Sequence, residues 1–445
     1  MIPSKYNNIF ELDQDHYVFV NLLSGACDVG DKLDKQVLES NKPRDEKEKQ
    51  NWLERGYFFN TPREEKLYTA ERYAEFMKAN QTNETQFLLV PTYGCNFNCA
   101  YCYQKGIESA SPVVSADMLE AFLRFVVDYR DREKRQVMVT LFGGEPLLLG
   151  NKPLVQRLVK LLKAENISLS VVTNGYYLTE YIDILKDVTI REIHVSLDGD
   201  REEHDRRRST RNGLGSFDRI LSGLKLAREA GFPINIRLIL DRITLPTLPA
   251  LATTLEKEGF FSLPVGQLKT SLGRNYELIN DYMKPDDLFS LDEMIREYVK
   301  LMAIHPLLRK LHLPSFFGIS QLVTKGEMYM PSYDTCPAGK SEYVFDASGN
   351  IFGCTASCGR KGYEIGTYYP SISWNEGELK QWQERSILTI PECQDCAVGV
   401  VCGGGCGVIS KDRTGKVKAP NCKPIKEVMQ EGVHFYKDFF LSDNK

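Results

Sequence analysis

The feature that most constrains the fold is a repeated succession of apolar, strand-length runs and helical segments from Phe87 to about Leu272. The runs are QFLLVPT, QVMVTLF, LSVVTNG, EIHVSLDG, INIRLIL and VGQLKTSL. The segments between them, such as SADMLEAFLRFVVDY, carry apolar residues at steps of three and four, which is typical of amphipathic helices. Strand followed by helix, about six times over, predicts an α/β fold with a parallel sheet, here a partial (β/α)6 TIM-like barrel.

The best-defined helix in this region is SFDRILSGLKLAREAG, residues 216–231. Ser216 has the side chain of an N-cap, and Gly231 is the kind of residue that ends a helix. The sequence therefore predicts a helix that Ser216 caps and Gly231 terminates.

Three further segments flank the predicted barrel, which we place at residues 87–275. Residues 1–80 contain a hairpin signal in HYVFVNLL and SGACDVGDK and a charged helix that ends at Gly56, and they predict a small α+β domain or a segment packed over one end of the barrel. Residues 276–335 have a helical pattern and bridge to residues 336–430. That last segment is rich in Cys and Gly, a composition typical of a domain organised by metal.

Charge and hydropathy exclude several functions. The 56 Lys and Arg against 60 Asp and Glu give a net charge of -4, so no strongly basic surface is expected and nucleic acid is not an expected partner. No run reaches the roughly 18 apolar residues of a membrane span, and the N-terminus lacks a signal peptide. We therefore expect a soluble, cytoplasmic protein, whose twelve Cys serve metal binding or catalysis rather than disulfides.

Cys95, Cys99 and Cys102 form a C-x3-C-x2-C loop directly after the first predicted strand, within PTYGCNFNCAYCYQ. Three thiolates on so short a loop can bind three corners of a cubane iron–sulfur cluster and leave the fourth iron open. The amino and carboxylate groups of a methionine can chelate such an iron. The alternative is a structural zinc site, which needs four ligands, usually in paired C-x2-C form.

Glycines and polar residues follow the next three predicted strands, where active sites of such folds lie. Each turn alone is weak evidence, because turn chemistry explains it. Their coincidence at successive strand ends is strong evidence for a bound ligand. The residues are Gly143, Gly144 and Glu145 in GGEP, Thr173 and Asn174 in TNG, and Ser196 and Asp198 in SLDG.

With these motifs, residues 87 to about 272 resemble the radical S-adenosylmethionine (SAM) family, including the aromatic Tyr101 before the third Cys. The resemblance implies that the loop holds a catalytic [4Fe-4S] cluster that cleaves SAM. It also implies that the GGEP turn flanks the methionine and that Ser196 and Arg208 contact the ribose and carboxylate. A solvated charge run remains the alternative reading of residues 206–208. The implied SAM-binding set is Tyr101, Gly143, Gly144, Glu145, Thr173, Asn174, Ser196, Asp198 and Arg208.

The C-terminal cysteines are spaced as C-x12-G-x4-C and then C-x2-C-x5-C-x3-C, with one Cys beyond. The first motif contains YVFDASGNIFGC, which predicts a hairpin with Gly349 at its turn. Residues 336–422 closely resemble the SPASM extension, which usually holds two auxiliary [4Fe-4S] clusters. The resemblance implies an inner cluster on Cys336, Cys354 and Cys406 and an outer cluster on Cys393, Cys396, Cys402 and Cys422.

The inner set lacks an obvious fourth ligand. Cys358 is the candidate, and the alternative is an iron left open for substrate. Cys27 is expected to be an ordinary buried thiol, and structural zinc is the alternative for the whole C-terminal set.

The resemblance implies an enzyme that abstracts hydrogen from a peptide or protein and installs a thioether or carbon–carbon crosslink or an oxidation. It further implies a leader peptide bound by residues 1–80 and an electron donor such as flavodoxin or ferredoxin. An anaerobic sulfatase-maturating enzyme is the alternative, although such enzymes usually place Asp where this chain has Thr355. A non-catalytic iron–sulfur carrier would not need GGEP or the ribose-binding residues.

Overall fold

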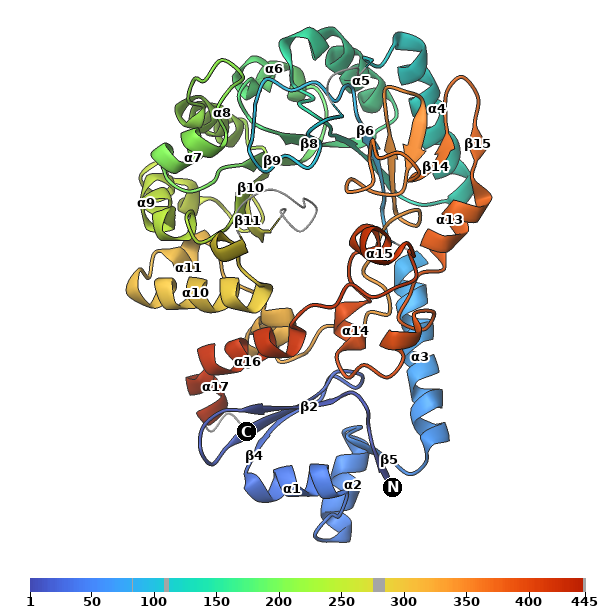
Figure 1. The fold of residues 1–445 in the computed structure, drawn as a ribbon, viewed down its shortest axis with the longest axis vertical. Helices are drawn as coiled ribbons and strands as arrows, with labels where there is room; N and C mark the ends of the chain where they lie inside the picture. The colour runs from blue at the N-terminus through green and yellow to red at the C-terminus, as the bar shows by residue number, and fades with distance from the viewer. Residues whose placement is uncertain (82, 108–111, 275–284, 443–445) are drawn as a thin grey trace.

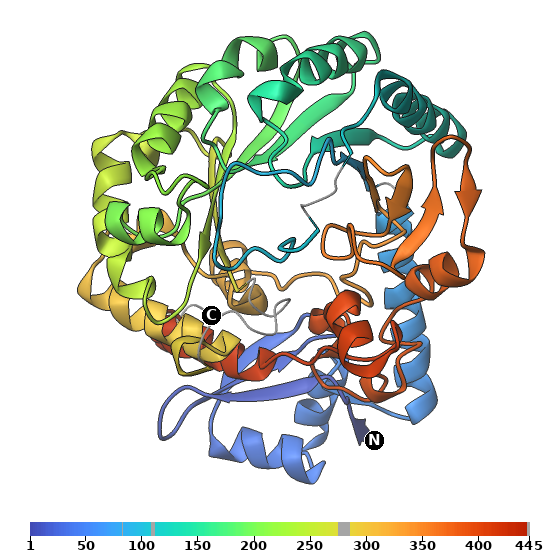
Figure 2. The ribbon, with the colours of Figure 1, turned by 45° about the horizontal axis from the view of Figure 1, so that its top comes forward.

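The largest element of the fold is a ten-stranded sheet, seen in a computed structural model that describes residues 1–81, 83–107, 112–274 and 285–442. Six parallel strands, paired in chain order, form a curved wall (Figures 1 and 2). Each predicted run overlaps one of them, so the α/β partial barrel is confirmed. The strands are β6 (Thr85–Leu89), β7 (Val137–Leu141), β8 (Ser168–Thr173), β9 (Ile190–Ser196), β10 (Ile234–Ile239) and β11 (Leu268–Gly273).

Helices lie on the outer face of this wall (Figure 2). Apolar side chains of the strands, such as Ile234 and Ile236, are fully buried in the core. Because side chains alternate along a strand, the neighbouring positions Asn235 and Arg237 face the barrel interior, which is therefore polar on this side. The helices are α4 (Ala116–Glu133), α5 (Lys152–Ala164), α6 (Ile182–Leu185), α7 (Arg201–Arg207), α8 (Phe217–Glu229) and α9 (Leu248–Lys257).

The predicted C-terminal hairpin is present, and it continues the barrel sheet. Strand β12 (Glu342–Phe345) pairs in parallel with β6, with Glu342 opposite Gln86 and Phe345 opposite Leu89. β13 (Asn350–Phe352), β14 (Glu364–Thr367) and β15 (Ser373–Trp374) follow in antiparallel order. Gly349 has a φ of 84° in the turn between β12 and β13, as its position predicts. The cysteine-rich segment is thus attached to the barrel by backbone hydrogen bonds.

The start of α8 differs from the prediction. Ser216 occupies the N-cap position, but its side chain makes no capping hydrogen bond. The Asp205 carboxylate accepts the backbone N–H groups of Ser216 and Phe217 at 2.6 and 2.8 Å instead. The Ser216 hydroxyl donates to the carbonyl of Arg208 at 2.8 Å. Asp205 and Ser216 together fix the segment that joins α7 to α8. Gly231 follows the helix with a φ of 74°, as predicted.

The N-terminal part contains a three-stranded antiparallel sheet, one strand more than the predicted hairpin. The Cys27 thiol lies in this part, and burial raises its pKa to about 12. The sheet consists of β2 (Asn7–Glu11), β3 (Tyr17–Asn21) and β4 (Cys27–Gly30), and the other elements are β1 (Ile2–Pro3), β5 (Phe58–Phe59), α1 (Lys32–Ser40), α2 (Glu46–Glu54) and α3 (Pro62–Gln81).

Helices complete the chain on either side of the cysteine-rich segment. Gln430 of α16 hydrogen-bonds the backbone of Glu11, so the end of the chain packs on β2. Residues 276–284 of the predicted helical bridge lie outside the described residues. The helices are α10 (Leu291–Ile304), α11 (Leu308–Leu311), α12 (Ile319–Lys325), α13 (Glu376–Gln383), α14 (Gly399–Cys402), α15 (Gly407–Thr414), α16 (Ile425–Phe435) and α17 (Lys437–Leu441).

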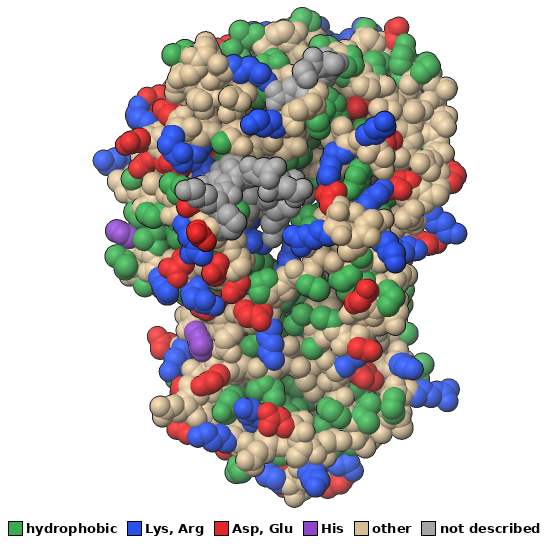
Figure 3. Space-filling model, viewed as in Figure 1, with side chains coloured by type: hydrophobic (Ala, Val, Ile, Leu, Met, Phe, Trp, Pro, Cys, Tyr) green, Lys and Arg blue, Asp and Glu red, His purple; other side chains and the backbone are tan. Residues whose placement is uncertain are grey.

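The surface agrees with the balanced composition. Positive and negative side chains are interspersed over the face shown in Figure 3. Within the described ranges, no helix has the length and apolar character that a membrane span requires.

Candidate functional site

The cysteine loop is held by the GGEP turn at the carboxyl ends of β6 and β7. The N–H of Gly144 donates to the carbonyl of Thr92 at 3.2 Å, and the N–H of Glu145 donates to the carbonyl of Gly94 at 2.9 Å. A Cβ on Gly144 would lie inside the van der Waals radii of two carbonyl oxygens, those of Tyr93 and Gly94. Glycine is therefore required for this backbone contact.

The other side of the loop is bound by the segment after α7. The N–H of Asn98 donates to the carbonyl of Ser209, and the Arg211 side chain donates to the carbonyl of Cys95 at 2.7 Å. Burial, followed by the Glu145 carboxylate, raises the pKa of the Cys95 thiol to about 12, and Cys99 and Cys102 add smaller contributions. The three thiols therefore lie close enough to repel one another when charged.

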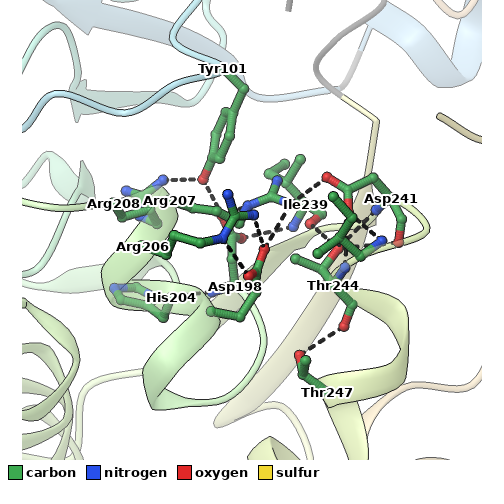
Figure 4. Close-up of polar contacts among 12 residues, drawn as sticks. Tyr101, Asp198, His204, Arg206, Arg207, Arg208, Ile239, Asp241, Thr244 and Thr247 are labelled. Carbon is green, nitrogen blue, oxygen red and sulfur yellow. Dashed lines mark hydrogen bonds and ion pairs between the residues drawn. The ribbon is translucent and has the colours of Figure 1, made fainter. Parts of the chain in front are cut away.

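The three adjacent arginines have different environments (Figure 4). Arg206 pairs with Glu203 on the surface, and its side chain is 57% exposed. Arg207 is buried and pairs with Asp241. Arg208 is buried, donates to the Tyr101 hydroxyl, and leaves its Nε atom without a partner among the described residues. The solvated charge run thus describes Arg206 alone.

Arg208 also lies next to the cysteine loop. Its guanidinium is 5.8 Å from the ring centre of Phe97. Burial raises the pKa of the Cys99 thiol, and the charge of Arg208 opposes that rise. A buried cation with a free N–H beside these thiols fits a carboxylate ligand, which is the role that the resemblance implies.

Glu145 connects three strand ends. Its carboxylate accepts the Thr173 hydroxyl and the Asn174 N–H, both at 2.6 Å, and the Leu147 N–H at 2.8 Å. Burial nevertheless raises its pKa to about 6. The Asn174 side chain reaches back to Asn96 in the cysteine loop at 2.8 Å. The predicted residues Thr173 and Asn174 are thus brought to the loop, and here they organise it.

Asp198 is fully buried, and its two oxygens accept the Tyr101 hydroxyl and the N–H of Ile239. This arrangement fixes Tyr101 in the loop. A direct contact of Asp198 with SAM stays a prediction. Ser196 ends β9 and pairs with Arg237 of β10 at the interior wall, and its contact with the ribose also stays a prediction.

The outer C-terminal cysteines lie together. Burial raises the pKa of the Cys393 thiol to about 11, and the nearby thiols of Cys402, Cys396 and Cys422 add to the effect, in that order. Cys402 ends α14, and Cys422 follows Asn421, whose N–H donates to the carbonyl of Gly404. These four thiols form the set that the SPASM resemblance implies.

Among the inner cysteines, the candidate ligand Cys358 contacts the segment that leads into the first loop. Burial and the charges of Glu342 and Cys336 raise the pKa of the Cys354 thiol. Cys358 is buried, and its sulfur is 3.1 Å from the hydroxyl of Tyr93, which also donates to Asp346. Cys406 lies at the N-cap position of α15.

Two tyrosines connect the loop with this inner set. Tyr93, which contacts Cys358 through its hydroxyl, stands two residues before Cys95. Tyr103 follows Cys102, and burial together with the thiols of Cys358 and Cys102 raises its pKa well above the usual range. The first cysteine loop and the inner cysteines therefore flank the same aromatic side chains.

Glu342 is a candidate that the sequence analysis did not select. It starts β12, its carboxylate accepts the N–H of Thr355 at 2.9 Å, and burial raises its pKa to about 7. Its signal in the sequence is an acidic residue at the start of the apolar run EYVF. The chain thus has a carboxyl group beside Thr355 although it lacks Asp at that position.

The first cysteine loop and the outer C-terminal set fit iron–sulfur clusters in donor type and grouping. Within the described ranges, however, no three His, Cys, Asp or Glu side chains stand close enough to hold a single metal ion. The unpartnered Nε of Arg208 supplies the remaining fit for SAM.

The comparisons with known proteins agree with this geometry. The profile of the Radical SAM superfamily matches residues 89–251. The chain therefore carries a radical SAM domain, which binds a [4Fe-4S] cluster and SAM, and the protein is a radical SAM enzyme. A curated relative, the radical SAM cyclopropyl synthase TigE of Paramaledivibacter caminithermalis, is 22% identical over 92% of this chain and 90% of that protein.

Two solved structures share the fold. SuiB of Streptococcus suis bound to precursor peptide SuiA matches 95% of this chain and 99% of that chain, with a TM-score of 0.56 and 14% identity. The enzyme anSMEcpe with bound AdoMet and the Kp18Cys peptide matches 80% of this chain and 96% of that chain, with a TM-score of 0.58 and 17% identity.

The contact at Gly144 gives the first prediction. Gly144→Ala should weaken SAM binding at least tenfold, because the added Cβ forces the turn away from the carbonyls of Tyr93 and Gly94. Gly150→Ala is the matched control, since a Cβ there meets nothing within 4 Å. Equilibrium binding of SAM to anaerobically reconstituted protein measures the effect. Equal affinity in both variants would show that the turn does not depend on this contact.

Proposed function

We propose that this enzyme modifies a peptide or protein and that its C-terminal cysteines hold two auxiliary [4Fe-4S] clusters. The observation that carries the proposal is the pairing of β12 with β6, which attaches the segment between Cys336 and Cys354 to the strand that precedes the radical SAM loop. The peptides named with SuiB and anSMEcpe support a substrate of this class.

When bound, the first cluster and SAM supply an electron and a 5′-deoxyadenosyl radical that takes hydrogen from the substrate. Cys95, Cys99 and Cys102 hold the cluster in this proposal. Arg208 binds the carboxylate of SAM with its free Nε, and the GGEP backbone binds the amino group. Glu145 keeps the loop and strand ends in one arrangement through its contacts with Thr173 and Asn174.

The interior wall fits a polar chain as substrate. His194 Nε2, Asn235 Oδ1 and Ser271 Oγ are buried without hydrogen-bond partners in the part of the chain that the structure describes. These side chains come from neighbouring strands, since His194 pairs with Asn235 across β9 and β10. Buried polar atoms normally have hydrogen-bond partners, so a peptide backbone or polar side chain in the interior would supply the missing hydrogen bonds.

The N-terminal part is proposed to bind a leader peptide as an added strand. Strand β4 is paired with β3 on one side, while a groove of about 360 Å³ lies along it, lined by Val29 and Gly30 and by Asn51 and Trp52 of α2. The opposite edge strand, β2, is covered by α16. Strand addition at β4 would satisfy main-chain groups and use the groove for side chains.

The electron donor and the cellular compartment are proposed from the enzyme class, that of radical SAM enzymes. Electrons would come from a flavodoxin or ferredoxin, and we propose that the enzyme works in the cytoplasm. Sulfatase maturation is a second candidate, and Glu342 favours it, because a carboxyl group lies at Thr355 where such an enzyme needs a base.

Iron content and SAM cleavage test the proposal. Reconstituted protein should hold about twelve irons per chain, as three cubanes require. Replacing Cys95, Cys99 and Cys102 by Ala should lower this to about eight irons and abolish 5′-deoxyadenosine formation. Iron near four per chain, with zinc present, would contradict the auxiliary clusters. Continued SAM cleavage in the triple variant would contradict the assignment of the loop.

The fourth ligand of the inner cluster can be tested separately. We propose that Cys358 fills this position, because it is buried near Cys354 and faces the Tyr93 hydroxyl. Cys358→Ala should then change the electron paramagnetic resonance (EPR) spectrum of the inner cluster without substrate. Cys27→Ala removes a thiol outside both sets and should leave this spectrum unchanged. If the spectrum of Cys358→Ala is normal and the native spectrum shifts when a Cys-containing peptide is added, the inner cluster has an open iron instead.

The leader-peptide proposal predicts an effect at β4. The probe is a synthetic peptide with the sequence of a short reading frame that neighbours the gene. Val29→Pro should weaken its binding at least tenfold, because Pro removes a backbone N–H donor from the strand. Val29→Thr keeps the donor and the β-branched shape and should bind normally. Fluorescence anisotropy measures both. Equal binding by the two variants would place the peptide elsewhere.

A further inference from the structure

The two C-terminal cysteine sets meet at a turn of three consecutive glycines. Gly403, Gly404 and Gly405 lie between Cys402 and Cys406 and have φ values of 61°, 83° and 70°. The Thr335 hydroxyl donates to the carbonyl of Cys402 at 3.0 Å, which brings Cys336 to the turn. The N–H of Asn421 donates to the carbonyl of Gly404, which brings Cys422 there.

Arg385, the second residue after α13, is inserted into this turn and is only 1% exposed. Its Nη2 donates to the carbonyls of Gly404 and Ala419 at 2.6 and 3.1 Å, and its Nε donates to the carbonyl of Val417 at 3.0 Å. These bonds fix the plane of the guanidinium. A Cβ on Gly404 would lie 3.1 Å from Nη1, so the absence of a side chain there makes room for Arg385.

The charge of Arg385 is not balanced by a carboxylate in the described part of the chain. The carboxylate of Asp334, which precedes Thr335, forms its ion pair with Lys340. The Nη1 atom of Arg385 is buried and has no hydrogen-bond partner there. A buried cation without an anion is costly, which indicates that a negative group belongs next to Nη1.

Thiolates are the anions that the fold brings to this place. Gly404, whose carbonyl accepts a hydrogen bond from Arg385, lies two residues after Cys402 of the outer set and two residues before Cys406 of the inner set. A [4Fe-4S] cluster with Cys thiolate ligands is negatively charged and becomes more so on reduction. One guanidinium therefore faces two sites that need positive charge.

We propose that Arg385 is the internal counter-cation of both auxiliary clusters. Its Nη1 donates a hydrogen bond to a sulfur of one cluster, and its charge raises the reduction potentials of both. Hydrogen bonds to the sulfurs and net charge are known determinants of these potentials. This inference rests on the proposed auxiliary clusters. Arg385 is thus a positioning and redox-tuning residue, not a catalytic one.

Potentiometric EPR titration of the reconstituted protein tests it. Arg385→Gln should lower the potential of at least one auxiliary cluster, so that the ratio of reduced to oxidised cluster at a fixed potential falls at least tenfold, which is about 59 mV for one electron. Arg385→Lys keeps the charge, and its cluster potential should lie between those of the wild type and Arg385→Gln. Lys418→Gln is the control, since this cation lies between Val417 and Ala419, whose carbonyls accept from Arg385, but pairs with Glu384 at the surface.

The outcomes separate the two proposals. If wild-type protein holds only about four irons per chain, the proposal of auxiliary clusters is wrong. If the iron content is full but the potential of Arg385→Gln is unchanged, only the role proposed for Arg385 is wrong. If the variant does not fold, the Cys95, Cys99 and Cys102 triple variant can be labelled with guanidinium-¹⁵N arginine. Pulsed EPR should then show ¹⁵N coupling to a reduced cluster, and its absence would overturn the inference.

Discussion

The backbone contact between the GGEP turn and the cysteine loop is the constraint on which the rest of the site depends. Adjacent parallel strands end at the same edge of the sheet, so β6 and β7 bring these two turns together. Only glycine at position 144 allows the carbonyls of Tyr93 and Gly94 to approach. Glu145, the next residue, then extends the contact to β8 through Thr173. One short turn thereby fixes the cysteine loop and the third strand end relative to each other.

The strands and most helices of the barrel could be predicted because their signals are local. Apolar runs and helical periodicity depend on residues a few positions apart, and Gly349 and Gly231 mark turns that the structure contains. The capping of α8 could not be predicted, because the acceptor is Asp205, from the preceding helix. Likewise, Arg206, Arg207 and Arg208 look alike in sequence. Only the turn of α7 decides which of them faces the cysteine loop.

Long-range pairing explains what else the sequence did not reveal. The hairpin of residues 342–352 has a local signal, but its parallel partner, β6, lies about 250 residues earlier, and no local pattern encodes that contact. The role of Glu342 depends on this pairing, because the pairing sets the direction of the Glu342 side chain. Arg385 is similar. A single Arg after a polar helix is typical of a surface, and its burial follows from glycines that come 19 residues later.

The pairing of β12 with β6 also determines how such a chain can be divided. A fragment that ends before β12 would contain all the residues that match the radical SAM profile, yet its first strand would present an unpaired edge. Exposed edges of this kind favour association, and a neighbouring copy can supply the missing strand. The cysteine-rich segment therefore contributes a strand beside the first strand of the barrel. A shortened chain would be expected to exchange strands between molecules.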